Sequence, residues 1–210
     1  MKLSLSWIRD YVAIPENMDL KKLAYDLTMS TVEVEDVEYL ADRFEHMVVG
    51  VIEEIQAHPN ADKLRVCKVD IGGEVKEIVC GGINLREGMR VAVSCPGAIV
   101  RWHGEGEPVV IKNSKLRGVE SFGMICASDE IGLGDLFPAS REAEILDLSA
   151  FEVPAGTPLA QALDMDDVLL EIDNKSMTNR PDLWGHYGIA REIGALYDLP
   201  LTQIEPYAPD

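Results

Sequence analysis

The spacing of apolar and polar residues changes character within the first 40 residues. Asp19 has the side chain of a helix N-cap, and it precedes apolar residues at helical spacing at positions 20, 23, 24 and 27. The stretch TVEVEDVEYL then alternates like a strand, but the alternation slips before Val37. This slip predicts a β-bulge or the end of the strand.

From about residue 41 to 150, short apolar runs are separated by glycine, proline and asparagine. The runs are MVVGVIEEI, LRVCKVDI, EIVCGG, RVAVSCPGAIV, EPVVIKNSKL and GMICAS. Gly72 and Gly73 lie between two of them and predict a tight hairpin, because glycine adopts positive φ without strain. Many short strands over roughly 100 residues favour a five-stranded OB-type β-barrel.

Helical patterning returns after residue 151, in VPAGTPLAQAL and in RPDLWGHYGIAREIGALYDL. Pro181 suits the first position of the second helix. Glycines at 185, 188 and 194 would each weaken that helix by about 1 kcal/mol unless another backbone packs against them. We expect an α+β chain in which 1–40 and 151–200 form one small discontinuous domain, 41–150 is an inserted barrel, and 201–210 is a linker to further domains.

Composition limits the possible functions. No run approaches the roughly 18 apolar residues of a membrane span, and the charged start lacks a signal-like apolar core, so we expect a soluble, cytoplasmic chain. The four cysteines lie in apolar runs with spacings unlike those of zinc ligands, which predicts buried free thiols and no metal site. They are Cys67, Cys80, Cys95 and Cys126.

Charge is unevenly distributed. The whole chain has 19 basic and 37 acidic residues, a net charge of −18, which disfavours nucleic acid as a ligand. Residues 63–117, however, hold ten basic and six acidic residues. A locally basic patch therefore lies on an acidic body.

Three blocks of sequence carry a family resemblance. HPNADKLRVCKVDIGG (58–73), IVCGGINLREGMRVAVSCPGAIV (78–100) and IKNSKLRGVESFGMICASDEIGLG (111–134) resemble, in order, the tRNA-binding module shared by several synthetases, stand-alone tRNA-binding proteins and EMAP-type cytokines. The flanks SLSWIRDYV and EIDNKSMTNRPDLWGHYGIAREIGAL resemble the domain that carries this module in the β subunits of bacterial phenylalanyl-tRNA synthetases. The resemblance covers nearly the whole chain.

The resemblance implies the N-terminal part of a longer subunit. It implies a tRNA ligand, a partner α subunit in a heterotetramer of two α and two β chains, and ATP and magnesium for the whole enzyme, which attaches phenylalanine to its tRNA. It places the aminoacylation chemistry on the α subunit. No catalytic residue or cofactor is therefore assigned within these positions.

OB barrels bind nucleic acid with cations for phosphate and aromatic rings for bases. Two basic clusters and one loop aromatic are the candidates for tRNA binding. In the alternating strand pattern, Lys68 and Arg65 point to opposite faces, so both cannot line one groove equally. Ordinary solvated charges, and an aromatic side chain folded back on the barrel, are the competing interpretations. The candidate tRNA-binding residues are Lys63, Arg65, Lys68, Trp102, Lys112, Lys115 and Arg117.

Other polar groups are better explained by structure than by chemistry. His58 and Asp62 flank a proline and an asparagine, which predicts a turn. The segment from Gly81 to Asn84 lacks the lysine and hydroxyl residue of a phosphate-binding loop and predicts a tight turn. Helix capping or domain stabilisation explains Asn179, Arg180 and Asp182, and solvent exposure is expected for the acidic pairs Asp129-Glu130 and Asp166-Asp167.

Two functional hypotheses therefore remain. A tRNA-binding structural region of the synthetase is the first, and a protein-interaction module that assembles the enzyme without binding tRNA is the second. The acidic balance favours the second. An independent hydrolase or redox enzyme has no nucleophile, metal or paired-carboxylate constellation to support it.

Overall fold

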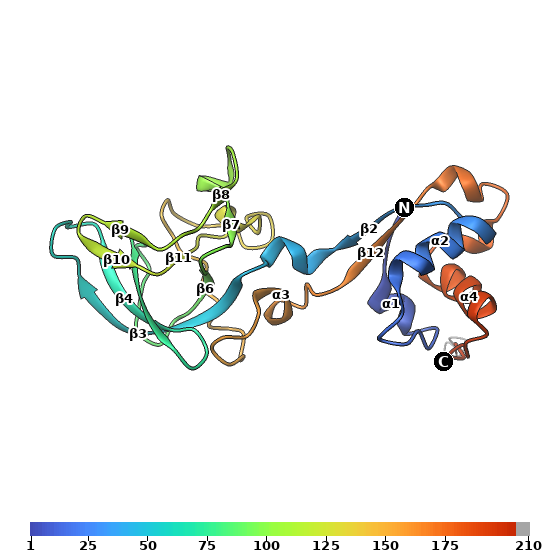
Figure 1. Cartoon of the computed structure of the whole chain (residues 1–210), viewed down its shortest axis with the longest axis horizontal. Helices are drawn as coiled ribbons and strands as arrows, with labels where there is room; N and C mark the ends of the chain where they lie inside the picture. Colours follow the sequence, from blue (N-terminus) through green and yellow to red (C-terminus); the bar gives the residue numbers. More distant parts are fainter. Residues whose placement is uncertain (205–210) are drawn as a thin grey trace, which may run out of the picture. The chain divides into compact units, whose positions relative to one another are not determined.

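The computed structural model describes residues 1–204, and the chain divides into two compact units (Figure 1). One unit joins Met1–Leu40 to the segment that starts at Asp167, and the other is Ala41–Asp166. Residues 205–210, most of the segment expected to be a linker, lie outside the described part of the chain.

The first unit packs helices against a three-stranded antiparallel sheet of order β1-β12-β2. Its core is a cluster of aliphatic residues contributed by both ends of the chain, including Leu3, Leu27, Leu170 and Ile193. The elements are β1 (Lys2–Ser4), α1 (Leu5–Arg9), α2 (Leu20–Ser30), β2 (Val34–Tyr39), β12 (Val168–Ile172), η4 (Asn174–Met177), η5 (Pro181–Leu183) and α4 (His186–Tyr197).

The predicted helix start and strand irregularity are both confirmed. Asp19 Oδ1 accepts hydrogen bonds from the backbone N–H groups of Lys21 (3.0 Å) and Lys22 (3.2 Å), and so caps α2. The pairing of β2 with β12 shifts register between Glu171 and Ile172. The slip in apolar alternation thus marks a bulge.

The helix predicted from Pro181 onward is wrong in its start. Pro181 begins a single 3₁₀ turn, and α4 begins only at His186, after Gly185 with φ of 123°. The expectation of close backbone packing holds for Gly188, since a Cβ there would lie 2.1 Å from the carbonyl oxygen of Asp182. Gly188 lowers the helix propensity of α4, but it allows the backbone of the preceding turn to pack against the helix.

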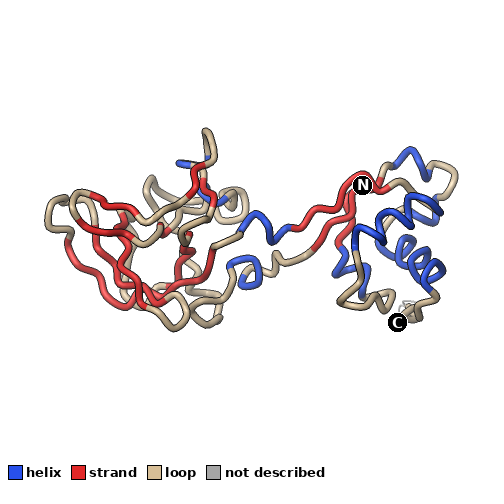
Figure 2. Tube along the Cα trace, in the orientation of Figure 1, coloured by secondary structure: helices blue, strands red, loops and turns tan. Residues whose placement is uncertain are grey.

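The second unit is built on a five-stranded antiparallel sheet of order β11-β6-β3-β4-β5, curved into a nearly closed barrel (Figure 2). This confirms the predicted α+β class with an OB-like barrel. The barrel elements are β3 (Met47–Ala57), β4 (Arg65–Asp70), β5 (Val75–Cys80), β6 (Arg90–Ser94) and β11 (Met124–Ile125). Around them lie η1 (Leu40–Phe44), β7 (Ile99–Val100), η2 (Trp102–Gly104), β8 (Val109–Val110), β9 (Ser114–Leu116), β10 (Val119–Ser121), η3 (Asp129–Ile131) and α3 (Leu159–Ala162).

The β4–β5 hairpin turns at the predicted glycine pair. Gly72 and Gly73 have φ of 101° and 94°, and Asp70 Oδ1 accepts hydrogen bonds from both of their N–H groups. A side chain at Gly72 would also meet the backbone of Gly156 at 2.6 Å. Positive φ and close approach together require glycine at this position.

Residues 151–166 pack with the barrel, whereas the sequence pattern groups them with the flanking segments. The N–H of Val49 donates to the Thr157 carbonyl (2.9 Å), and the N–H of Gly156 donates to the Val49 carbonyl (2.8 Å). Leu159 of α3 is fully buried in the barrel's apolar cluster. A helical sequence pattern does not reveal which core a helix covers.

All four cysteines are free, and three of them are buried, as predicted; Cys95 is partly exposed. Burial raises the pKa of Cys67 to about 11 and those of Cys80 and Cys126 to about 12. Such thiols remain protonated at neutral pH and behave as small apolar side chains.

Candidate nucleic-acid interface

A buried histidine joins two loops of the barrel that are distant in sequence. His58 is 6% exposed and follows β3, at the start of the loop that leads into β4. Its Nδ1 accepts a hydrogen bond from the N–H of Asn60 (3.1 Å), so its Nε2 carries the proton and donates to the carbonyl of Leu116 (3.1 Å). The predicted turn role is confirmed, with a tertiary contact added to it.

Asn60 makes a second link to the same place. Its side-chain Nδ2 donates to the carbonyl of Arg117 (3.0 Å), in the turn between β9 and β10. That turn has positive φ at Arg117 (46°) and Gly118 (99°). The two hydrogen bonds thus hold the β3–β4 loop beside the β9–β10 turn.

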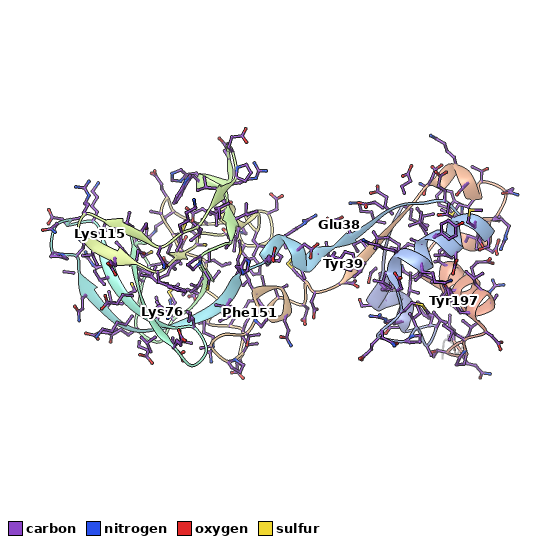
Figure 3. The ribbon with its side chains drawn as sticks, viewed as in Figure 1. Glu38, Tyr39, Lys76, Lys115, Phe151 and Tyr197 are labelled. Atoms are coloured by element: carbon purple, nitrogen blue, oxygen red, sulfur yellow. The ribbon has the colours of Figure 1, made fainter. Side chains whose placement is uncertain are left out.

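These links bring two residues from each predicted basic cluster, the one at 63–68 and the one at 112–117, to one edge of the barrel. Lys63 and Arg65 lie on or just after the β3–β4 loop, while Lys115 and Arg117 lie on the β9–β10 hairpin, and all four are exposed. Lys115 is labelled on the hairpin in Figure 3. We call these four residues the basic edge.

The hairpin that carries half of the basic edge is anchored to strand β5. The N–H of Val79 donates to Ser121 Oγ (3.1 Å), and the N–H of Phe122 donates to the Glu77 carbonyl (3.0 Å). Ser121 is buried and donates from its own hydroxyl to the Gly123 carbonyl (3.0 Å). The basic residues therefore project from a fixed support.

Lys68 differs from the four residues of the basic edge because it forms an ion pair with a glutamate. Its Nζ lies 2.6 Å from the Glu54 carboxylate on β3, and Glu77 is its directly opposed neighbour on β5. The hydrogen bond with Glu54 and the attraction of both carboxylates raise the pKa of Lys68. The positive charge of Lys68 is therefore already partly balanced by Glu54.

Arg65 keeps a free charge, although its guanidinium is tethered. Nη1 donates to the backbone carbonyls of Asp62 and Leu64, both at 3.0 Å. Neutral carbonyls leave the positive charge uncompensated, and they fix the direction of the side chain. The Arg65 side chain is therefore held against the backbone of the β3–β4 loop.

Trp102 lies apart from the basic edge, and Lys112 precedes the strand that carries Lys115. Trp102 is 50% exposed in η2, where the preceding Arg101 N–H donates to the carbonyl of Glu130 (2.9 Å). Lys112 is exposed in the segment between β8 and β9. Figure 1 shows the β7–β8 region away from the β9–β10 turn. The structure therefore does not group Trp102 with the four cations.

Two acidic residues expected in solvent are partly buried instead. Glu130 accepts a hydrogen bond from the Ala127 N–H (2.8 Å), and burial raises the pKa of its carboxyl group. Asp167 accepts hydrogen bonds from Ser4, Ser6 and Val168. Their neighbours Asp129 and Asp166 are exposed as expected. The sequence pattern around these acidic pairs did not predict which member of each pair is exposed and which is partly buried.

The remaining polar groups have structural partners. Asn84 exchanges two hydrogen bonds with the backbone of Ile145 (2.8 and 2.9 Å), as a loop-fixing residue does. Arg180 binds Asp182 through two nitrogens and also Glu192 (2.8 Å), which locks the entry to α4. Within residues 1–204, no group of histidine, cysteine and acidic residues could hold a metal ion.

Curated relatives and solved structures resemble the chain to different extents. Phenylalanine–tRNA ligase β subunits are 37% identical over 203 residues in Oceanobacillus iheyensis and 42% identical over 209 residues in Thermosynechococcus vestitus. The matches cover 96% and 99% of this chain but 24% of each relative, so the chain spans about a quarter of their length.

Among solved structures, a protein related to methionyl-tRNA synthetase (MetRS) from Pyrococcus horikoshii is 23% identical with a TM-score of 0.37, covering 54% of this chain and 87% of that one. The C-terminal domain of Plasmodium vivax p43 is 26% identical with a TM-score of 0.29, covering 38% and 43%.

A family model described as "Putative tRNA binding domain" matches residues 47–157. This range contains the barrel, the His58 link and the whole basic edge. Because the match covers more than half of the residues, the chain belongs to this tRNA-binding domain family, and it is homologous to part of the phenylalanine–tRNA ligase β subunit.

Proposed function

We propose that the chain is the tRNA-binding and structural N-terminal region of a phenylalanine–tRNA ligase β subunit. The observation that carries the proposal is the basic edge, where two loops of a tRNA-binding family barrel are hydrogen-bonded together and present four exposed cations. Phosphate contacts from such residues supply affinity that does not depend on sequence.

The activity of the longer enzyme follows from the relatives. They are ligases of phenylalanine and tRNA by name, so we propose that the whole assembly, in the cytoplasm, couples phenylalanine to its tRNA with ATP and magnesium, and that an α subunit completes a heterotetramer of two α and two β chains. We assign no catalytic step to these residues.

Salt-dependent binding tests the proposal. Fluorescence anisotropy of labelled tRNA is measured against the chain at low and moderate salt, and we expect affinity to fall steeply as salt rises, because bound phosphates release counterions. Lys63→Ala combined with Lys115→Ala should weaken binding. The control, Lys21→Ala combined with Lys175→Ala, removes the same charge from the other unit and should not.

The net charge favours a second candidate function, assembly of the enzyme without tRNA contact. An acidic surface repels RNA, and Lys68 is already paired with Glu54. Binding of the chain to the α subunit and to tRNA, measured in separate experiments, distinguishes the two functions. No tRNA binding at low salt, together with α-subunit binding, would replace the first candidate by the second.

A further inference from the structure

A cavity of about 500 Å³ opens between β5 and the β9–β10 hairpin. Its size falls within the range of small-molecule sites, about 300–1,000 Å³. Glu77 contributes from β5, and the hairpin and the residues beside it contribute the rest of the wall. The lining includes Glu77, Asn113, Ser114, Lys115, Glu120 and Phe122.

The walls differ in chemistry. Lys115, which belongs to the basic edge, is directly opposed to Glu120 across the hairpin. Phe122 offers a half-buried aromatic ring, and Lys76 Nζ lies 4.9 Å from the centre of that ring. The N–H of Phe122 donates to the Glu77 carbonyl, which fixes this wall to β5. A cation, an aromatic surface and two carboxylates thus line one cavity.

We propose that this cavity receives an unpaired guanine nucleotide of the bound RNA, an inference that rests on the proposed function. Guanine presents N1–H and the N2 amino group side by side, and a carboxylate accepts both hydrogen bonds at once. Adenine, cytosine and uracil do not present two adjacent donors on that edge. The carboxylate of Glu77 or of Glu120 is the acceptor, Phe122 contacts the base, and Lys115 contacts a phosphate.

The two carboxylates distinguish this cavity from a surface that binds only phosphates. A surface that binds RNA only through phosphates is weakened by acidic side chains, since like charges repel. Recognition of unpaired RNA bases uses hydrogen bonds to the Watson–Crick edge together with stacking on aromatic rings. We therefore assign base discrimination to the carboxylates beside Lys115. The same carboxylates weaken the binding of RNA through its phosphates, because like charges repel.

Replacement of guanosine by inosine tests this directly, because inosine lacks only the N2 amino group. Short single-stranded uridine RNAs with one central guanosine, inosine or adenosine are titrated against the 210-residue chain by anisotropy at low salt. We expect guanosine to bind at least about fivefold more tightly than inosine or adenosine, the lower end of the range for a two-bond base contact.

The carboxylate variants change two readouts in opposite directions. Glu77→Gln and Glu120→Gln should each bind all-uridine RNA more tightly, because negative charge is removed, and the variant that removes the acceptor carboxylate should lose the preference for guanosine. The matched control, Glu107→Gln, removes one exposed charge of the same unit outside the cavity and should keep the preference. This contrast separates base recognition from electrostatics.

Failures of the two proposals are distinguishable. Salt-sensitive binding with equal affinity for guanosine and inosine would overturn the guanine cavity and leave the proposed function intact. A preference that survives in both glutamine variants would also overturn the cavity. No binding to any of the RNAs or to tRNA at low salt would overturn both.

Discussion

The Nε2 atom of His58 lies 3.1 Å from the carbonyl oxygen of Leu116, a hydrogen bond between residues 58 positions apart in the chain. Together with the hydrogen bond from Asn60 Nδ2 to the Arg117 carbonyl, it joins the β3–β4 loop to the β9–β10 turn. The relative placement of the cations of the basic edge therefore depends on the hydrogen bonds of a buried histidine.

Loss of that histidine should loosen the basic edge. His58→Ala removes the acceptor for the Asn60 N–H and the donor to Leu116, and we expect the free energy of unfolding to fall by about 1–2 kcal/mol. Binding of tRNA should weaken as well, because the two loops are uncoupled. Urea denaturation and anisotropy measure the two effects. The control is His103→Ala, an exposed histidine in η2, and wild-type behaviour of both variants would contradict the link.

Cations of the basic edge and Lys68 should behave differently in salt titrations. Lys115→Ala and Arg117→Ala should each reduce the slope of log affinity against log salt by about 1. Lys68→Ala should change the slope less, since its charge is paired with Glu54. Glu54→Gln releases Lys68 and should strengthen binding. Equal slopes for all three cation variants would show that the pairing does not matter.

Asp167 should stabilise the first unit through its hydrogen bonds. It accepts from Ser4 Oγ (2.5 Å), Ser6 N–H (2.9 Å) and Val168 N–H (2.7 Å). Asp167→Asn replaces one acceptor oxygen by an amide donor, and we expect a loss of about 1–2 kcal/mol in urea denaturation. Asp166→Asn changes the exposed neighbour and should have little effect. Similar losses for both variants would mean that net charge, not the hydrogen bonds, is responsible.

Stability of the first unit should decrease on mild acidification. Burial lowers the pKa of His186 from its ordinary 6.5, against the opposing attraction of Asp167, and Nε2 accepts the Ser4 N–H (3.1 Å). The folded state therefore binds this proton more weakly than the unfolded chain does. The contribution is complete above pH 6.5 and is lost as pH falls through the lower pKa of the folded state.

Asp167 adds a second step of the same sign at more acidic pH. Burial alone would raise the pKa of its carboxyl group, but the hydrogen bonds from Ser4, Ser6 and Val168 outweigh burial and lower it below 3.8. Urea denaturation followed by tryptophan fluorescence across pH 7.5 to 5.5 isolates the histidine step. His186→Gln keeps an acceptor for Ser4 and should flatten the dependence there. An unchanged slope in that variant would assign the step to another group.

Local patterns predicted the parts of the fold that local forces decide. The Asp19 cap, the Gly72-Gly73 turn and the slip before Val37 depend on side chains and backbone angles within a few residues. The start of α4 was misplaced because Pro181 suits a 3₁₀ turn as well as an α-helix, and the close approach of Gly188 to the Asp182 carbonyl decides between them.

The sequence alone determined the barrel, its family and the identity of the candidate cations, because short apolar runs, glycine turns and ordered motifs are properties of neighbouring residues. Tertiary structure alone decided which of these cations lie on loops that are joined to each other. Strand register placed Glu54 and Glu77 beside Lys68, and the hydrogen bonds of His58 and Asn60 set the β3–β4 loop against the β9–β10 turn. Charge pairing depends on distances across strands, and the spacing of residues along the chain does not fix those distances.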